Sequence, residues 1–408
     1  MFFGGGTPDT SDTSYWDGDL PWVSSQDVRG GGLTSTARRI TDAGLKNSSA
    51  RIATAGSLVF VMRSGILKHS LPVSLLEMDA AVNQDIKSLY PVRLWDARYL
   101  LYFFAGWQAQ LLAAWRTQGA TVESLRFDLM QKTLLPCPAR DAQAAIVAYL
   151  DAEVSRIDSL IERKQRFIDL LLERRTALIT HAVTKGLDQT AEMKDTAVEW
   201  YGLSPSHWKS GKLGHIGTTS GGCTPSKEEP RFWGGDVPWV TPKDMKVREV
   251  SDSLDHVTTE AMAETGLRYE SPGAVLVVVR GMILARTVPV AVNTVPITMN
   301  QDMKAIRCAA GVEPRFLLCV LEGLSGALQT IVEEAAHGTR CLRTDLWNTF
   351  RIMVPPIDEQ REIVSFLDAE TAKIDALVGR TLMGVNLLKE YRTALISAVV
   401  TGQIEVGN

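Results

Sequence analysis

Four aspartates stand at matching places in two similar stretches of the sequence, and paired carboxylates are one way to hold a metal ion. Asp19 and Asp27 lie in YWDGDLPWVSSQD at residues 15–27, and Asp236 and Asp244 lie in FWGGDVPWVTPKD at residues 232–244. The surrounding Trp, Pro and Gly residues are typical of turns, where Asp side chains accept hydrogen bonds from backbone amides. We therefore interpret these aspartates as turn caps and expect no metal site.

Other residues that do chemistry are scattered. The histidines form no H-E-x-x-H cluster. The sequence has no G-x-x-x-x-G-K-[ST] phosphate loop and no Asn/Asp-Pro-Pro-aromatic motif of adenine methyltransferases, and we interpret FFGGGTP at residues 2–8 as a tight turn. We expect no catalytic activity in this chain. Without a C-x-x-C pair, we expect buried free thiols rather than zinc ligands or disulfides at Cys137, Cys223, Cys308, Cys319 and Cys341.

The composition describes a globular protein of more than one domain. The chain has 408 residues, of which 45% are hydrophobic and 22% are charged, and a single core rarely grows to that size. No apolar run approaches the length of a membrane span, and MFFGGGTPDT lacks the features of a secretory signal, so we expect a cytoplasmic protein without membrane contact. With a net charge of −4, a DNA-binding chain would have to gather its positive charge on one face of each globular part, or a partner would have to share the DNA contacts.

The two aspartate stretches belong to a long internal repeat. At a constant offset of 217 residues, RSGILKHSLPV (63–73) matches RGMILARTVPV (280–290), NQDIK (83–87) matches NQDMK (300–304), and IVAYLDAEVSRIDSL (146–160) matches IVSFLDAETAKIDAL (363–377). The chain is therefore two copies of one module, far longer than a solenoid repeat. The lead-in EWYGLSPSHWKSGKLGHIG (199–217) has no partner in the first copy, which predicts either an altered first domain or a start upstream of Met1.

Each module begins with a mixed α/β domain and ends in a long helix. Helical patterns run from about Ala142 to Thr184 and from about Glu359 to Thr401, with Asp141 and Asp358 as expected N-caps. Leu and Ile recur every seven residues, so we expect two antiparallel helices that form a coiled coil with pseudo-two-fold symmetry. The polar residue in the middle of each series, Lys164 or Thr381, either sets the register or is a solvated gap. The series are Leu150, Ile157, Leu171 and Leu178, and Leu367, Ile374, Leu388 and Leu395, widened by Ile146, Leu160, Ile161, Ile363, Leu377 and Val378.

The combination of motifs resembles the specificity subunit of a Type I restriction-modification system. The shared motifs are T-P…W-x-G-D-[LV]-P-W-V, R-x-x-I-L and N-Q-D in the α/β part, and P-x-x-[DE]-x-Q…[IV]-V-x-[FY]-L-D…I-D-x-L…R-T-A-L-I in the helix. The resemblance implies target-recognition domains at residues 1–140 and 191–357, separated by spacer helices at residues 141–190 and 358–408.

The resemblance also implies a function without catalysis. The two domains would read the halves of an asymmetric, bipartite target in double-stranded DNA, and the helices would set the gap between them. Two methyltransferase subunits would dock on the helices, and motor-nuclease subunits would join them. S-adenosylmethionine, ATP and magnesium would then be bound by the partners, with no cofactor in this chain. Two alternatives from other classes are a fused restriction-methylation enzyme and a scaffold whose domains bind protein.

Basic and amide side chains are the candidates for DNA contacts. Arg and Lys neutralise phosphates or bind guanine, and Asn and Gln can bind adenine through two hydrogen bonds; the alternative for each residue is a solvated charge or a turn cap. We interpret Trp16, Trp22, Trp233 and Trp239 as core residues rather than base-stacking platforms. The candidates are Gln26, Arg63, Lys68, Asn83, Gln84 and Lys87 in the first copy, and Lys243, Arg280, Arg286, Asn300, Gln301 and Lys304 in the second.

Overall fold

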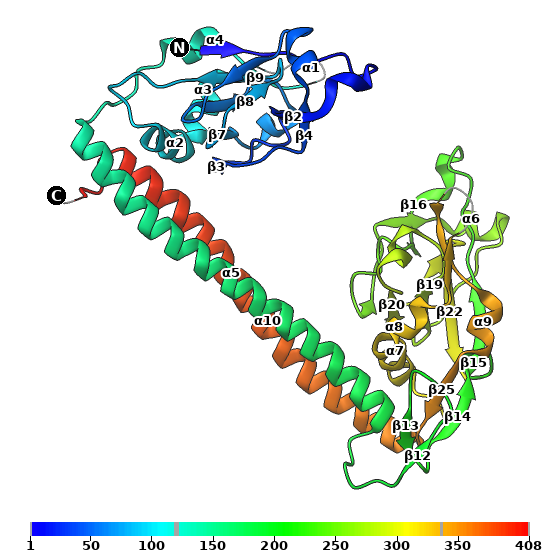
Figure 1. The fold of residues 1–408 in the computed structure, drawn as a ribbon. Helices are drawn as coiled ribbons and strands as arrows, with labels where there is room; N and C mark the ends of the chain where they lie inside the picture. Colours follow the sequence, from blue (N-terminus) through cyan, green and yellow to red (C-terminus); the bar gives the residue numbers. More distant parts are fainter. Residues whose placement is uncertain (1, 118–121, 335–337, 407–408) are drawn as a thin grey trace. The chain divides into compact units, whose positions relative to one another are not determined.

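A computed structural model describes residues 2–117, 122–334 and 338–406. The chain divides into two compact units, one made of Met1–Arg166 with Thr381–Asn408, and the other of Phe167–Arg380. Each unit contains one α/β head and one part of each of the two long helices, α5 (Arg140–Lys185) and α10 (Ile357–Val400) (Figure 1). The helices begin close to the predicted domain limits, whereas the compact units divide both helices near their middles. Among the described residues, no helix is long and apolar enough to cross a membrane.

The head of the first unit is built mainly from two larger sheets, with a two-stranded sheet of β10 and β11 and several helices beside them. One sheet has the strand order β1-β9-β6-β7-β3, and the other has the order β4-β2-β8-β5. The apolar run LVFV forms β6, which is buried along its whole length at the centre of the first sheet. The strands are β1 (Phe2–Gly4), β2 (Trp16–Val23), β3 (Gly32–Leu33), β4 (Arg38–Ile40), β5 (Arg51–Ala53), β6 (Leu58–Val61), β7 (Val73–Leu76), β8 (Ala80–Val82), β9 (Ile86–Leu89), β10 (Arg116–Thr117) and β11 (Ser124–Leu125). The helices are α1 (Asp42–Lys46), α2 (Ala97–Gly106), α3 (Gln108–Trp115) and α4 (Phe127–Lys132), with short 3-10 helices η1 (Thr13–Tyr15) and η2 (Gly65–Lys68).

The head of the second unit repeats this topology at the offset of 217 residues. Its main sheet has the order β15-β22-β19-β20-β17, and each strand is the counterpart of the strand at the same place in the first head. Its second sheet has the order β18-β16-β21. The strands are β15 (Gly217–Gly221), β16 (Trp233–Val240), β17 (Glu249–Val250), β18 (Asp255–Val257), β19 (Val275–Val278), β20 (Val290–Asn293), β21 (Thr298–Met299), β22 (Met303–Cys308), β23 (Val332–Glu334) and β24 (Arg340–Leu342). The helices are α6 (Thr259–Glu264), α7 (Pro314–Gly323), α8 (Ser325–Gln329) and α9 (Thr344–Thr349), with η3 (Leu213–His215), η4 (Pro230–Phe232) and η5 (Met282–Ala285).

The lead-in to the second copy and the residues just before it add strands that the first head lacks among its described residues. β12 (Met193–Asp195) pairs with β13 (Leu203–Pro205), and β14 (Lys209–Lys212) pairs antiparallel with β25 (Arg351–Val354). Trp200 of the lead-in stacks on Phe350, with ring centroids 4.4 Å apart, and Trp208 is buried. In the first copy, residues 134–137 correspond to β25 but lie outside any strand, and Leu134 is 92% exposed.

The repeated tryptophan motif forms a bulged strand that packs two indoles edge to face. In β2, Trp16 and Trp22 have ring centroids 5.2 Å apart at an interplanar angle of 89°, and both indole N–H groups donate to backbone carbonyls. The register shifts between Trp16 and Leu20. Gly18 is required there because a Cβ would lie 2.6 Å from the Ile40 carbonyl oxygen. The core interpretation is confirmed for Trp16, Trp22 and Trp239, which are buried, whereas Trp233 is half-buried.

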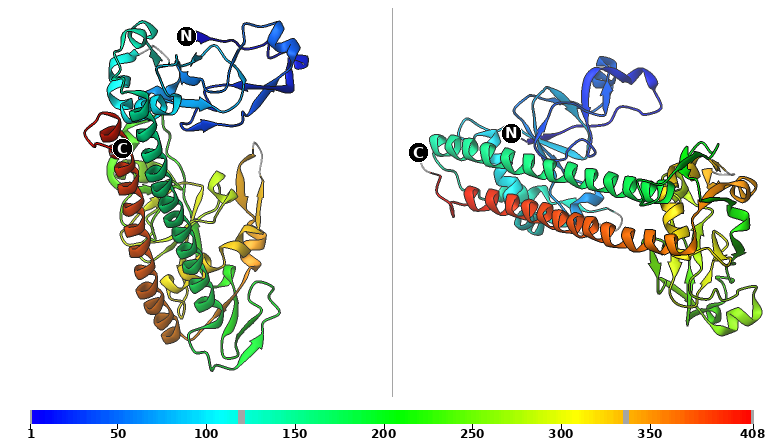
Figure 2. Two further views of the ribbon diagram at one scale, coloured as in Figure 1. Left: turned by 60° about the vertical axis from the view of Figure 1, so that its left-hand side comes forward. Right: turned by 90° about the horizontal axis from the view of Figure 1, so that it is seen from below.

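The two long helices pack against each other through the predicted seam. Within each unit they lie side by side, and Figures 1 and 2 show that they run antiparallel. In the first unit Arg392 Nε lies 2.9 Å from Asp158 Oδ1, and in the second unit Arg175 Nε lies 3.0 Å from Asp375 Oδ1. Each residue of one ion pair is the 217-residue counterpart of a residue in the other, so the repeat extends to the contacts between the helices. The buried seam residues are Leu150, Ile157, Leu171, Leu367 and Leu395, while Leu178, Ile374 and Leu388 are half-buried.

Three smaller expectations need correction or refinement. Asp141 and Asp358 are not N-caps but lie inside the first turns of their helices, where the helix dipole still favours a carboxylate. The expectation of buried thiols is wrong for Cys137, which is exposed. Cys319 is buried, and the other cysteines are half-buried. The polar residues in the middle of the two seven-residue series are not solvent-exposed: Lys164 is half-buried and Thr381 is buried.

Candidate nucleic-acid interface

Strand pairing gathers the candidates of the first head at one end of its two sheets. β2 and β8 run parallel and end together, because Val23 pairs with Val82 and the Asn83 amide donates to the Val23 carbonyl at 3.1 Å. β6 and β9 are antiparallel, with Val61 beside Ile86, so the residues after β6 lie at the same end as those before β9. Three segments are therefore neighbours: the turn with Gln26 after β2, the residues around Arg63 after β6, and the N-Q-D turn before β9.

The second head builds the same end from its own strands. The Asn300 amide donates to the Val240 carbonyl at 3.1 Å, and the Arg280 amide donates to the Asp302 carbonyl at 3.3 Å. The turn after β16, which carries Lys243, thus lies beside the second N-Q-D turn. Lys68 in the first head and Arg286 in the second lie further along the connections that leave this end, in or just after η2 and η5.

The asparagines of the two N-Q-D turns act as turn braces. Asn83 and Asn300 are buried, and their Oδ1 atoms accept hydrogen bonds from the amides of Asp85 at 3.0 Å and Asp302 at 3.1 Å. Their oxygens are therefore engaged within the turn. Contact of the candidates with DNA stays a prediction. The exposed candidates are Gln26, Arg63, Lys68, Gln84, Lys243, Arg280, Arg286 and Gln301, while Lys87 and Lys304 are half-buried.

The aspartates after the tryptophan motif brace the adjoining loop, as the turn-cap interpretation expects. Asp27 Oδ2 accepts hydrogen bonds from the amide and the hydroxyl of Ser24, both at 2.8 Å, and Oδ1 accepts from the Ala37 amide at 2.8 Å. Asp244 makes the same contacts with Thr241 and Leu254 in the second head. In the part of the chain that the structure describes, no group of three or more His, Cys, Asp or Glu side chains could hold a metal ion.

Polar depressions at these ends include residues that sequence reasoning missed. One in the first head has a volume of about 480 Å³, and one in the second has a volume of about 580 Å³. Arg51 and Lys227 line them but belong to none of the motifs. Arg51 has an identical counterpart, Arg268, and that identity at the repeat offset is the signal that would have found it. The first depression is lined by Gly4, Gly5, Ser48, Ser49, Ala50, Arg51, Gln84 and Lys87, and the second by Lys227, Trp233, Trp239, Thr241, Pro242, Lys243, Asp255, Asn300 and Asp302.

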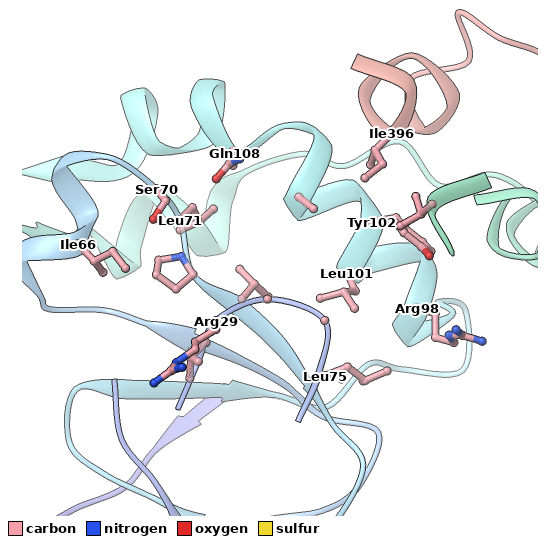
Figure 3. A pocket seen from close by; sticks show the side chains of 18 of the residues that line it. Arg29, Ile66, Ser70, Leu71, Leu75, Arg98, Leu101, Tyr102, Gln108 and Ile396 are labelled. Carbon is pink, nitrogen blue, oxygen red and sulfur yellow. The ribbon is translucent and has the colours of Figure 1, made fainter. Parts of the chain in front are cut away.

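A larger cavity of about 940 Å³ in the first unit lies between the head and its parts of the long helices (Figure 3). Two of its arginines are already neutralised, because Arg98 pairs with Asp151 at 2.8 Å and Arg392 pairs with Asp158. The Tyr102 hydroxyl also donates to Asp151 at 2.8 Å, and its burial, reinforced by that carboxylate, raises its pKa. The cavity therefore belongs to the junction between head and helices rather than to a reactive centre.

Curated relatives of this chain are specificity subunits. Residues 205–381 match the family described as Type I restriction modification DNA specificity domain. The chain is 31% identical over 199 residues to the Type I restriction enzyme EcoR124I/EcoR124II specificity subunit of Escherichia coli, covering 48% of this chain and 46% of that protein. It is 30% identical over 181 residues to the Type I restriction enzyme MjaIX specificity subunit of Methanocaldococcus jannaschii, covering 43% of this chain and 40% of that protein. The matched part thus spans less than half of either relative.

Solved structures share the fold over nearly the whole chain. A chain from a structure that describes complex assembly and conformational transition of the type I R-M system has a TM-score of 0.73 at 17% identity, covering 98% of this chain and 96% of that one. The HsdS subunit from Thermoanaerobacter tengcongensis has a TM-score of 0.50 at 16% identity, covering 98% and 95%. Two α/β heads with two long helices are thus the architecture of this structural class. The domain match and the curated relatives thus make part of the chain similar to Type I restriction-modification specificity subunits, and the solved structures show that the fold is shared over nearly its whole length.

Proposed function

We propose that this chain is the non-catalytic DNA-reading subunit of a Type I restriction-modification complex. The observation that carries the proposal is the duplicated arrangement of exposed basic and amide side chains at one equivalent end of each head. Because the heads differ in sequence around that shared end, they would read different half-sites, and the whole target would be asymmetric and bipartite. The long helices would set the number of unread base pairs, as rigid elements do in other proteins that read two half-sites.

We further propose that the long helices dock two copies of a methyltransferase subunit. Large apolar side chains are exposed on the helices at equivalent positions of the repeat: Tyr149 and Phe366 are 36% and 38% exposed, and Leu170 and Leu387 are 61% and 62% exposed. Exposed apolar side chains at repeated positions favour protein contact, and their duplication favours two copies of one partner. Motor-nuclease subunits would join this assembly in the cytoplasm. S-adenosylmethionine, ATP and magnesium would be bound by the partners.

Methylome mapping tests the proposal directly. The full chain is co-expressed with its methyltransferase subunit in a host without adenine methylation, and modified adenines are mapped by sequencing. We expect one asymmetric motif with an unread gap, absent when this chain is omitted. Methylation by this chain alone would favour a fused enzyme. An assembled complex that neither methylates DNA nor binds duplex DNA selectively would favour a protein-binding scaffold.

A further inference from the structure

One set of three hydrogen-bond donors is identical in the two heads. Arg51, Gln84 and Lys87 of the first head have Arg268, Gln301 and Lys304 as counterparts at the repeat offset. The arginines and glutamines are exposed, and the lysines are half-buried, in both copies. By contrast, several neighbouring candidates differ between the copies, as Gln26 and Lys243 do. We call each set the donor triad of its head.

The first donor triad surrounds the polar depression of about 480 Å³. The Thr7 hydroxyl donates to Gln84 Oε1, which leaves the amide N–H groups as the outward hydrogen-bonding side of Gln84. A weak contact of 3.4 Å joins Gln84 Nε2 to Asp85 Oδ2. Gly5 allows the backbone to approach closely here, because a Cβ would lie 1.8 Å from the Val82 carbonyl oxygen. In the second head, Thr224 donates to Gln301 in the same way.

The cations of the triads lack carboxylate partners within the described part of the chain. No ion pair involves Arg51, Lys87, Arg268 or Lys304 there, whereas many other arginines, such as Arg98, are paired. Lys87 Nζ lies 5.1 Å from the centroid of the Phe127 ring, a cation–π contact that leaves its charge uncompensated. The first depression, lined by an arginine, a lysine and an amide, offers hydrogen-bond donors that suit an anion. Guanine also offers two acceptors in the major groove, so the identity of the triad in both heads is what favours phosphate.

We propose that the donor triads bind DNA phosphates and that the residues differing between the heads read the bases. This inference rests on the proposed function. The two half-sites share only the sugar-phosphate backbone, so a contact that is identical in both heads is suited to backbone binding, which positions a protein without reading sequence. The triads would fix the register of each head on its half-site.

Salt dependence of binding separates phosphate contacts from base contacts. Affinity for a random-sequence duplex is measured by fluorescence anisotropy over a salt series, using the full chain and a variant with Arg51→Gln, Lys87→Gln, Arg268→Gln and Lys304→Gln. We expect the slope of log K against log salt to fall in magnitude by about 0.9 for each phosphate contact removed. Arg93→Gln is the matched control, because Arg93 follows β9 at the far end of the strand from the N-Q-D turn.

The possible outcomes distinguish phosphate binding by the donor triads from base reading and test the proposed function separately. If the wild-type chain binds duplex DNA and the variant shows the same slope, phosphate binding by the donor triads is refuted, while the proposed function stands. A normal slope with an altered base preference in the methylated motif assigns the triads to base reading and also overturns the inference. If the wild-type chain binds no duplex DNA at low salt, both phosphate binding by the donor triads and the proposed function are refuted. If the fourfold variant melts early, Arg51→Gln alone is used, because this exposed side chain has no hydrogen bond or ion pair within the described residues.

Discussion

Substituting Gln360 with leucine should loosen the attachment of the second head to α10. Gln360 is fully buried, and its Oε1 accepts a hydrogen bond from the Glu313 amide, just before α7, at 2.8 Å. Its Nε2 donates to the carbonyls of Gly311 and Pro355, both at 2.8 Å. Leucine fills a similar volume but leaves these backbone groups without partners. Water can reach exposed Gly311, whereas Pro355 is buried.

The expected loss of unfolding free energy is about 3 kcal/mol, because each buried group left without a partner costs about 1–3 kcal/mol. Denaturant unfolding gives the size of the effect, and hydrogen exchange locates it at the start of α7 and α10. Gln143→Leu should behave alike in the first head, since Gln143 makes the equivalent contacts with Asp96, Leu94 and Pro138. Gln165→Leu, at an exposed position of α5, is the matched control. Equal denaturation midpoints for Gln360→Leu and Gln165→Leu would refute the reasoning.

Three further predictions test the scaffold. Arg392→Ala should cost less than about 1 kcal/mol because its ion pair with Asp158 is partly exposed, and a double-mutant cycle measures this; a coupling of several kcal/mol would contradict it. Trp22→Phe should cost about 2 kcal/mol through the lost indole hydrogen bond and packing, without changing DNA preference; a changed methylation motif would assign Trp22 to base reading. Burial raises the pKa of Cys319 to about 11, so little thiolate forms near neutral pH, and iodoacetamide should label exposed Cys137 first. Peptide mapping checks the order, and equal labelling in the native protein would refute it.

The repeat and the long helices could be predicted from sequence because their signals are local. A seven-residue apolar period identifies α5 and α10 to within a few residues, and a constant offset reveals the duplication without any fold knowledge. The sheet order of the heads could not be predicted, since many of their strands are only two to four residues long and pair over long distances in the chain. Short strands carry little periodicity, and their pairing is decided by packing.

In the candidate site, too, residues within repeated motifs could be found from the sequence, whereas residues placed there by strand pairing could not. Motif reasoning found Gln84 and Lys87 because they stand in or beside the repeated N-Q-D turn. It missed Arg51, whose stretch has little else in common with its counterpart, although strand pairing places it beside Val82 at the same end of the sheet. It named Asn83 as a candidate for base contact with a turn cap as the alternative, and in the structure the Asn83 oxygen braces a turn. Whether a polar side chain faces outward depends on contacts that the sequence does not reveal.

The junctions between heads and helices show how duplicated modules diverge without losing their geometry. In the second unit, Arg248 joins its loop to Glu322 of α7 at 3.1 Å and to Asp368 of α10 at 3.4 Å. The counterpart of Arg248 in the first copy is Gly31, which cannot make such a bridge.

The first unit satisfies the equivalent carboxylate differently. The Asp151 carboxylate, the counterpart of Asp368, accepts the hydroxyl of Tyr102, where the second copy has Cys319. Arg248 from a loop and Tyr102 from a helix thus each donate to the equivalent carboxylate. In the first unit the loop with Gly31 lines the cavity of about 940 Å³. Loss of either donor alone would leave a partly buried carboxylate with one partner fewer. The difference between Gly31 and Arg248 and the difference between Tyr102 and Cys319 are therefore best understood as one linked change. Such linked changes allow the loops of the two heads to differ while the attachment of each head to the helices persists.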